Sequence, residues 1–164
     1  FNQSFAYRSV VVIGTPGNDG NGSIRGHVRL YQIDLHTTTQ LTELQAITYI
    51  ASNPDLINAF GTNTTSAKSH YLNNGKSEGG ILDDFDEWGY LASNNDLISS
   101  IGILAVEAVK HYISFGYSQG KVTNSFDAQS YLNKYADLRN AFGNDQELAT
   151  KHYVENGFNE GRVF

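Results

Sequence analysis

The sequence predicts a mainly α-helical protein in which three tandem 41-residue helical repeats follow an N-terminal β-hairpin. Three observations lead to this fold class. One set of residue types recurs every 41 residues without an insertion, which is typical of a repeat architecture. Within each copy, apolar residues fall at helical spacing between glycine and asparagine breaks. The first 35 residues are instead rich in β-branched residues and turn residues.

The repeat is defined by positions that carry the same residue in all three copies. The shared pattern is Y-[IL]-x4-D-L-x4-G-x5-A-x2-H-Y-x3-G-x3-G. We assign the helical domain to residues 41–164 and its copies to 41–81, 82–122 and 123–164. Because helices of this length are marginal alone, the copies must bury their apolar faces against one another. The recurring positions are Tyr49, Tyr90 and Tyr131; Asp55, Asp96 and Asp137; His70, His111 and His152; and Gly75, Gly116 and Gly157.

Each copy is expected to contain two or three short helices. In the first copy, Thr42 and Gln45 match a capping box. The Asn53-Pro54 step predicts a break and then a second helix over residues 54–60, which Gly61 ends. The last helix is predicted over residues 64–74, with equivalents near 105–115 and 146–156. The expected caps in the other copies are Asp83 with Asp86, Asn124 with Asp127, and Asn144 with Glu147.

Two further expectations concern the last helix of each copy. The middle copy is the most apolar, with Leu104, Ala108, His111, Tyr112 and Phe115 on one broad face, which suits a repeat that has a neighbour on each side. The glycine of the H-Y-x3-G pattern is expected to take the left-handed conformation that ends a helix.

Residues 1–35 are predicted to form the β-hairpin. Residues 10–13 and 27–33 read as strands on either side of a glycine-rich turn segment, and residues 36–40 read as a polar linker. A single hairpin is at best marginally stable in water. We therefore expect residues 5–33 to pair with another subunit or with another part of a larger protein.

Composition excludes several classes of protein. The chain has no cysteine, so it holds neither a disulfide framework nor a thiolate zinc site. From residue 41 onward there are eight Lys and Arg against fifteen Asp and Glu, which disfavours nucleic-acid binding. No apolar run reaches the roughly 18 residues of a membrane span. An acidic, cysteine-free composition rich in Asn, Ser, Thr and Gly is typical of secreted or cell-surface bacterial proteins.

The recurring residues could carry chemistry or could serve the scaffold. The histidines and aspartates could form metal or acid–base pairs, but their recurrence favours a structural hydrogen bond from histidine to aspartate or to the backbone. The tyrosines could form a sugar-stacking stripe, but core positions are favoured. Calcium could bind at Asp83, Asp84 and Asp86, or at Asp19, although helix caps and a plain loop explain these residues as well. We expect no catalytic residue and no cofactor other than a possible calcium ion.

The first copy resembles a known tandem module through the segments YIASNPDL, AKSHY and GKSEG. That module, YLAxNPD[LV]…AxxHYxxxGxxEGR, occurs in large bacterial secreted and surface proteins beside calcium-binding repeats, propeller repeats or hydrolase domains. The resemblance implies an accessory module with no assigned reaction. The second copy departs from the pattern at Asn95 and Gln119, and the third at Tyr135 and Ala136. Residues 10–33 resemble FG-GAP, the integrin-type β-propeller repeat, without its acidic calcium loop.

These observations predict a non-enzymatic structural or interaction module of a secreted or cell-surface protein, acting in adhesion or self-assembly through its N-terminal strands. Its partner would be another protein or a second copy. The alternative is a calcium- or carbohydrate-binding module that targets a larger extracellular enzyme to a surface glycan. A hydrolase with a pair such as Asp55 and His70 is least favoured, because no nucleophile accompanies the pair at regular spacing.

Overall fold

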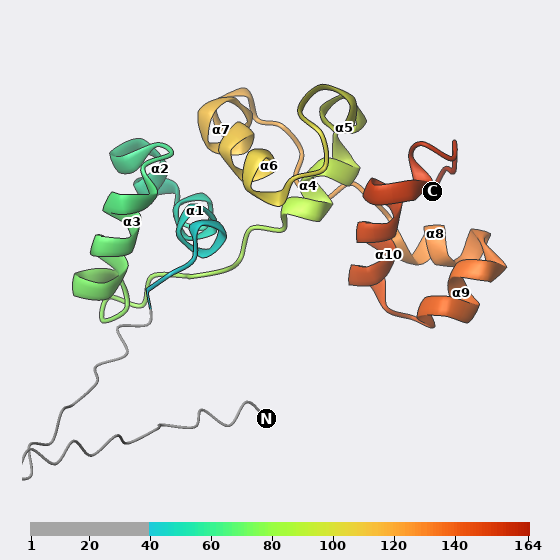
Figure 1. Ribbon diagram of the computed structural model, residues 1–164, viewed down its shortest axis with the longest axis horizontal. Coiled ribbons are helices and arrows are strands. Elements are labelled where there is room, and N and C mark those ends of the chain that lie inside the picture. The colour runs from blue at the N-terminus through green and yellow to red at the C-terminus, as the bar shows by residue number, and fades with distance from the viewer. Residues whose placement is uncertain (1–39) are drawn as a thin grey trace, which may run out of the picture. The chain divides into compact units, whose positions relative to one another are not determined.

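Short helices build the part of the chain described by the computed structural model, residues 40–164 (Figure 1). The chain divides after Thr39 into two units, and residues 40–164 form the second. The predicted hairpin, Asp19 and the linker up to residue 39 lie outside the described residues. Within residues 40–164 the prediction of a helical repeat fold is confirmed.

The three copies share one order of elements, in which the last α-helix continues into a turn of π-helix, labelled η. The first copy contains α1 (Glu43–Ala51), α2 (Pro54–Phe60), α3 (Thr64–His70) and η1 (Tyr71–Gly75). The second contains α4 (Glu87–Ser93), α5 (Asn95–Ile101), α6 (Ala105–His111), η2 (Tyr112–Gly116) and α7 (Tyr117–Gln119). The third contains α8 (Ala128–Lys134), α9 (Ala136–Phe142), α10 (Gln146–His152) and η3 (Tyr153–Gly157).

Polar side chains cap five of the ten α-helices of residues 40–164, although not always at the predicted residue. The Thr42–Gln45 capping box is present at α1. At α4 and α8 the cap lies three residues later than predicted: Asp86 accepts from the Gly89 N–H and Asp127 from the Ser130 N–H, both at 2.8 Å. The cap of α10 is Asp145, one residue after the predicted Asn144. Helix α6 has no side-chain cap.

The break between the first two helices of a copy does not depend on proline. Pro54 begins α2 as predicted, and Gly61, with φ +52°, follows its end. The same break occurs at Asn94 and at Tyr135, where no proline follows. Asn94 explains its own break, because its amide donates to Tyr90 O and to Val122 O and thus ties the end of α4 to a distant loop.

Each of the first two copies also holds the linker that leads into the next copy. Ser52 Oγ accepts from the Asp84 and Phe85 N–H groups at 2.9 and 3.1 Å. Ser93 Oγ accepts from the Ser125 and Phe126 N–H groups at 2.8 and 3.3 Å. Since these N–H groups are engaged by serine, the linkers remain extended and α4 and α8 begin later than predicted.

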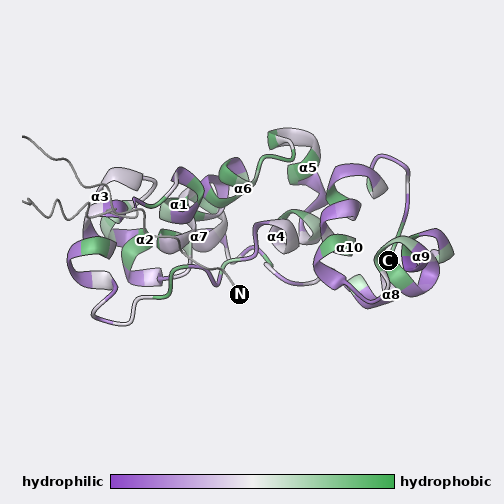
Figure 2. Ribbon diagram, turned by 60° about the horizontal axis from the view of Figure 1, so that its bottom comes forward, coloured by the Kyte–Doolittle hydropathy of each residue, from purple (hydrophilic) through white to green (hydrophobic). Residues whose placement is uncertain are grey.

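The first helix of a copy packs both on the last helix of its own copy and on that of the next. Thus α1 contacts α3 and α6, α4 contacts α6 and α10, and α8 contacts α10. Figure 2 shows hydrophobic and hydrophilic residues side by side on these helices, as expected of amphipathic segments. The prediction of a broad buried face on the middle copy is wrong at its ends, since Leu104 and Phe115 are 65% and 55% exposed. Val109 in α6 and Ile113 in η2 are buried instead, and both of these elements contact α1.

One face of the first helix changes character in the third copy. Three equivalent positions hold Ile47, Thr48 and Ala51 in α1, Trp88, Gly89 and Ala92 in α4, and Gln129, Ser130 and Asn133 in α8. The α1 residues, with Gly89 and Ala92, are buried, whereas Ser130 and Asn133 are exposed. This face is therefore apolar or small where a further copy packs and polar on α8.

No single helix within residues 40–164 has the length and hydropathy of a membrane span. One pair, Asn95–Ile101 with Ala105–Gln119, reaches them only across a bend of 112°.

Candidate functional site

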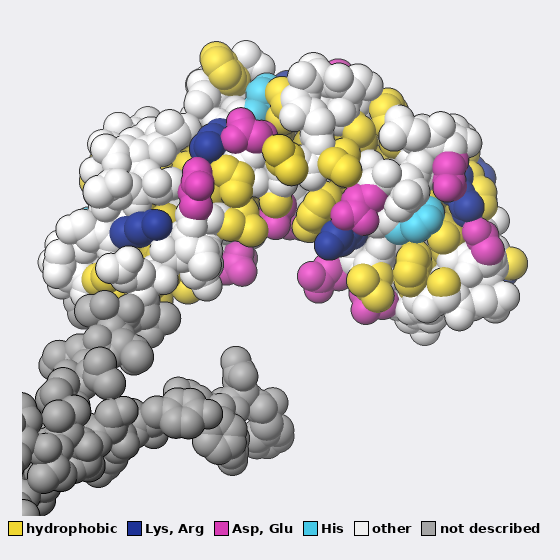
Figure 3. Space-filling view, viewed as in Figure 1, with side chains coloured by type: hydrophobic (Ala, Val, Ile, Leu, Met, Phe, Trp, Pro, Cys, Tyr) yellow, Lys and Arg dark blue, Asp and Glu magenta, His cyan; other side chains and the backbone are white. Residues whose placement is uncertain are grey.

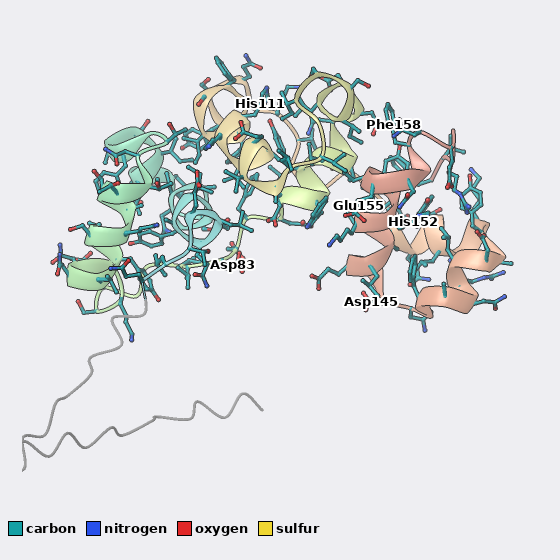
Figure 4. All side chains as sticks on the ribbon, viewed as in Figure 1. Asp83, His111, Asp145, His152, Glu155 and Phe158 are labelled. Atoms are coloured by element: carbon teal, nitrogen blue, oxygen red, sulfur yellow. The ribbon has the colours of Figure 1, made fainter. Side chains whose placement is uncertain are left out.

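The recurring tyrosine and histidine form a hydrogen bond in every copy. The tyrosine Oη lies 3.0 Å from the histidine Nδ1 in the Tyr49–His70 pair, 2.9 Å in Tyr90–His111 and 3.1 Å in Tyr131–His152. Each histidine is the last residue of its α-helix, directly before the π-helical turn, and Figure 4 labels His111 and His152. The predicted partner of the histidine, aspartate or backbone, is therefore wrong, because the histidine bonds to the tyrosine of its own copy.

Burial keeps both side chains of the middle tyrosine–histidine pair uncharged at neutral pH. Burial raises the pKa of Tyr90 to about 12, and the nearby Asp96 and Tyr112 raise it further. Burial also lowers the pKa of His111, an effect to which the Lys121 charge adds and which Asp96 opposes. Neither Tyr90 nor His111 therefore carries a charge at neutral pH, and one of the two donates the hydrogen bond to the other. A tyrosine so reluctant to ionise and a histidine already bonded to it make a poor acid–base pair.

Each copy requires glycine at this position because the tyrosine hydroxyl leaves no room for a side chain. A Cβ on Gly75, Gly116 or Gly157 would overlap Oη of the tyrosine of the same copy. The prediction of a left-handed helix end at these glycines is wrong, since Gly116 has a helical φ of −59°. Positive φ values occur four residues later, at Gly79, Gly120 and Gly161. Tyrosine, histidine and glycine thus form one packing unit, repeated three times.

The tyrosines cannot act as a sugar-stacking stripe. Tyr49, Tyr90 and Tyr131 are at most 1% exposed, and Tyr153 is 3% exposed. Tyr71 and Tyr112 are partly buried and pack edge-on against the tyrosine of their own copy, with ring centroids 5.1 and 5.4 Å apart. These rings belong to the core.

In the second and third copies the recurring aspartate pairs with a basic residue near the end of its own copy. Asp96 accepts from Lys121 Nζ at 3.1 Å, and Asp137 lies 2.9 Å from an Arg162 nitrogen. The Arg162 hydrogen bond lowers the pKa of Asp137. In the first copy the position of Lys121 and Arg162 is occupied by Gly80. Sequence reasoning missed these pairs, although the bases lie at the same 41-residue interval as the aspartates.

Asp83, Asp84 and Asp86, the calcium candidates, line an open groove of about 620 Å³ together with Glu87 and Glu147. The groove draws its remaining residues from α1, α4, α8 and α10 and includes the Phe85, Trp88 and Phe126 rings. No Lys or Arg of residues 40–164 belongs to its lining. Figure 3 shows acidic side chains on both sides of the hollow along the lower edge of the repeats.

The carboxylates of this groove do not converge as calcium ligands. In residues 40–164 no group of three or more His, Asp or Glu side chains is placed to hold a metal ion. Asp86 is engaged as the cap of α4. Burial raises the pKa of Glu87, and the nearby Asp86, Asp83 and Glu147 charges raise it further. The groove is therefore an acidic surface that favours positively charged groups and lacks the geometry of a metal centre.

A smaller recess of about 280 Å³ lies in the first copy, where Gly80 replaces the basic residue. Its lining includes Tyr49, Asp55, His70, Glu78 and Gly80. Asp55 and Glu78 are exposed, and Glu78 lies 4.0 Å from His70 Nε2. Asp55 and His70 thus share a recess, but His70 is already bonded to Tyr49 through Nδ1.

The chain matches no protein-family model, and no curated protein or solved structure is detectably similar to it. Its function therefore has to be argued from the geometry of the repeats.

Proposed function

We propose that this chain is a non-enzymatic interaction module of a secreted or cell-surface protein, in which stacked helical repeats present acidic recesses to a protein partner. The acidic groove carries the proposal. It gathers five carboxylates from the second and third copies beside three aromatic rings, in a volume within the range of ligand and peptide sites. Electrostatic complementarity of this kind increases the rate and selectivity of protein association.

The internal contacts of the repeats support a role without catalysis. The histidine of each copy, the residue best suited to proton transfer at neutral pH, is bonded to a buried tyrosine. The same contact occurs three times, which suits a scaffold requirement better than three reaction centres. Self-assembly through the N-terminal strands and the extracellular location remain part of the proposal on the strength of the sequence pattern.

Substitution of all three histidines distinguishes scaffold from catalysis. We expect the variant with His70→Gln, His111→Gln and His152→Gln to unfold at a lower temperature than the parent, measured by circular dichroism. A variant that keeps the parent unfolding temperature while losing a hydrolytic activity of the parent would contradict the proposal.

Sedimentation velocity over a hundredfold concentration range tests the interaction role directly. Growth into larger species with concentration would support self-assembly. A monomer throughout would contradict self-assembly and restrict the function to a different partner protein.

A further inference from the structure

The three copies differ at one position that is chemically informative, the one occupied by Gly80, Lys121 and Arg162. In the third copy two carboxylates hold the Arg162 guanidinium: Asp137 bonds to its terminal nitrogen and Glu160 to Nε. In the second copy Gln119 replaces the glutamate, and the base is Lys121, bonded to Asp96 at 3.1 Å. Arginine thus occurs with two carboxylates and lysine with one.

The first copy keeps both carboxylates and lacks the base. Asp55 is equivalent to Asp137 and Glu78 to Glu160, while Gly80 provides no side chain. Both carboxylates line the 280 Å³ recess together with Tyr49 and His70. Neither is buried, and Asp55 has no ion pair with any residue of 40–164. The recess therefore presents the acceptors of the third copy without the group that they hold there.

We propose that the recess of the first copy binds an arginine side chain of a partner protein, which takes the place that Arg162 occupies in the third copy. The inference rests on the proposed interaction function and names the chemical group that one recess recognises. A planar guanidinium can engage two carboxylates at once, whereas an ammonium acts as a point charge. Within these repeats the Arg162 guanidinium engages both Asp137 and Glu160. Lys121 bonds to a single carboxylate, Asp96, in the copy where glutamine replaces the glutamate.

The recess differs from a general acidic surface because the second and third copies hold a basic side chain at the equivalent position. The groove between the copies also attracts cations, but no copy of this chain shows a cation held by its carboxylates. For the recess, the second and third copies show which base is held, Lys121 or Arg162, and which acceptors hold it. Arg162 additionally stacks on Tyr135 at 4.7 Å, whereas the equivalent residue in the first copy is Asn53. A bound arginine would therefore depend on Asp55 and Glu78 more than Arg162 depends on its own acceptors.

The test uses the full chain labelled with ¹⁵N and three peptides that differ in one side chain: acetyl-Gly-Arg-Gly-amide, its lysine analogue and its citrulline analogue. Citrulline has the shape of arginine without the charge. We expect saturable shifts of the amide resonances of residues 78–81 with the arginine peptide, at least fivefold weaker binding of the lysine peptide, and no saturable shift with citrulline. Equal responses to arginine and citrulline, or no response to arginine, would overturn the inference.

Matched variants separate the recess from general charge attraction. Asp55→Asn with Glu78→Gln removes two exposed carboxylates from the recess and should weaken binding of the arginine peptide at least tenfold. Glu43→Gln with Glu107→Gln removes two exposed carboxylates that line neither the recess nor the groove and should leave binding within twofold. Equal loss in both double variants would show attraction by net charge alone and would also overturn the inference.

A gain-of-function variant gives an independent readout. Gly80→Arg should place the missing guanidinium in the recess and abolish binding of the arginine peptide. Because a Cβ on Gly80 lies 2.9 Å from Tyr49 Oη, the thermal unfolding temperature of Gly80→Arg is compared with that of a variant carrying the same Cβ, which it should exceed. Gly80→Gln is its control for added bulk and should not raise the unfolding temperature. If Gly80→Arg is no more stable than Gly80→Gln, the recess does not hold a guanidinium.

The two proposals can fail separately. If the chain does not bind the arginine peptide but forms larger species at higher concentration in sedimentation velocity, the interaction function is supported and arginine recognition by the recess is contradicted. If the chain binds the peptide and remains a monomer, arginine binding at the recess is supported and self-assembly is contradicted.

Discussion

Helices α4 and α8 are equivalent in backbone but differ on the face that a following copy would cover. Helix α4 places Ala92 there, 1% exposed, where α8 places the exposed Asn133. The same backbone therefore serves as an internal layer or as a polar end, and a few side chains decide which. Repeat proteins require such polar terminal faces for solubility.

The residues that hold the linkers change in the same way. Ser93 and Asn94 fasten the linker into the third copy, whereas the third copy itself has Lys134 and Tyr135 at these positions. Tyr135 instead accepts the Val163 N–H at 3.0 Å and stacks on Arg162. The residues of the stacking face and those that bond the following linker thus differ together between the second and third copies, which indicates that both serve to join one copy to the next.

The largest effect is expected from moving the polar face into an internal layer. Ala92→Asn introduces the α8 residue at a position covered by the third copy, so it must overfill the contact and bury an amide. We expect a loss of about 3 kcal/mol in the free energy of unfolding, measured by urea denaturation of the full chain. The matched control is Asn133→Ala on exposed α8, expected within about 0.5 kcal/mol of the parent. Equal losses in the free energy of unfolding for the two variants would contradict the conclusion that this face is covered on α4 and exposed on α8.

The next effect tests the packing unit that all copies share. Gly116→Ala places a methyl group against Tyr90 Oη and should cost about 2 kcal/mol. In a Tyr90→Phe background, which alone should cost about 1 kcal/mol, most of the glycine effect should disappear because the obstructing oxygen is gone. A glycine effect of the same size in both backgrounds, measured by a double-mutant cycle, would show that contact with the hydroxyl is not its cause.

A smaller effect is expected from the linker bonds. Ser93→Ala removes the acceptor of the Ser125 and Phe126 N–H groups and should lower the free energy of unfolding by about 1 kcal/mol. At the equivalent position of the third copy, Lys134→Ala should have no measurable effect. Urea denaturation of the two variants in parallel sharpens the comparison, and a larger cost for Lys134→Ala would refute it.

The smallest effect is a dependence of stability on pH that arises in the middle copy. The pKa of His111 is lowered in the folded state, chiefly by burial and then by Lys121, while Asp96 opposes the shift. The unfolded chain therefore binds more protons near its ordinary histidine pKa, and the free energy of unfolding falls as the pH drops below about 6.5. His111→Gln should reduce this slope between pH 7 and pH 5, measured by urea denaturation at each pH. An unchanged slope would remove His111 as its source.

The sequence predicted the 41-residue spacing of the copies, the Thr42 cap and the start of α2 at Pro54, because each depends on local chemistry or on repetition. It misplaced the caps of α4 and α8, since Asp83 and Asp86 are equally good caps and only the bond from Ser52 to the linker distinguishes them. Such a bond spans 32 residues and leaves no local pattern.

The role of Gly75, Gly116 and Gly157 was also beyond local reasoning. A glycine that ends a helix and a glycine that makes room for a distant hydroxyl look identical in sequence. The recess of the first copy was different, because its signal was present: Gly80, Lys121 and Arg162 align at the repeat interval. The residues that differ between the copies at this position therefore indicate the recess without any structure.

The linker bonds have a consequence for how the chain folds. They join residues 32 or 33 positions apart, and the longest side-chain hydrogen bond within residues 40–164, from Tyr153 to Asn95, spans 58. No contact has to wait for the two ends of the repeat region to meet, so little loop entropy opposes each step. Helical domains rich in contacts of short sequence separation fold on the order of microseconds to milliseconds. The repeat region is thus suited to acquire its structure copy by copy as the chain emerges from its site of synthesis or passage.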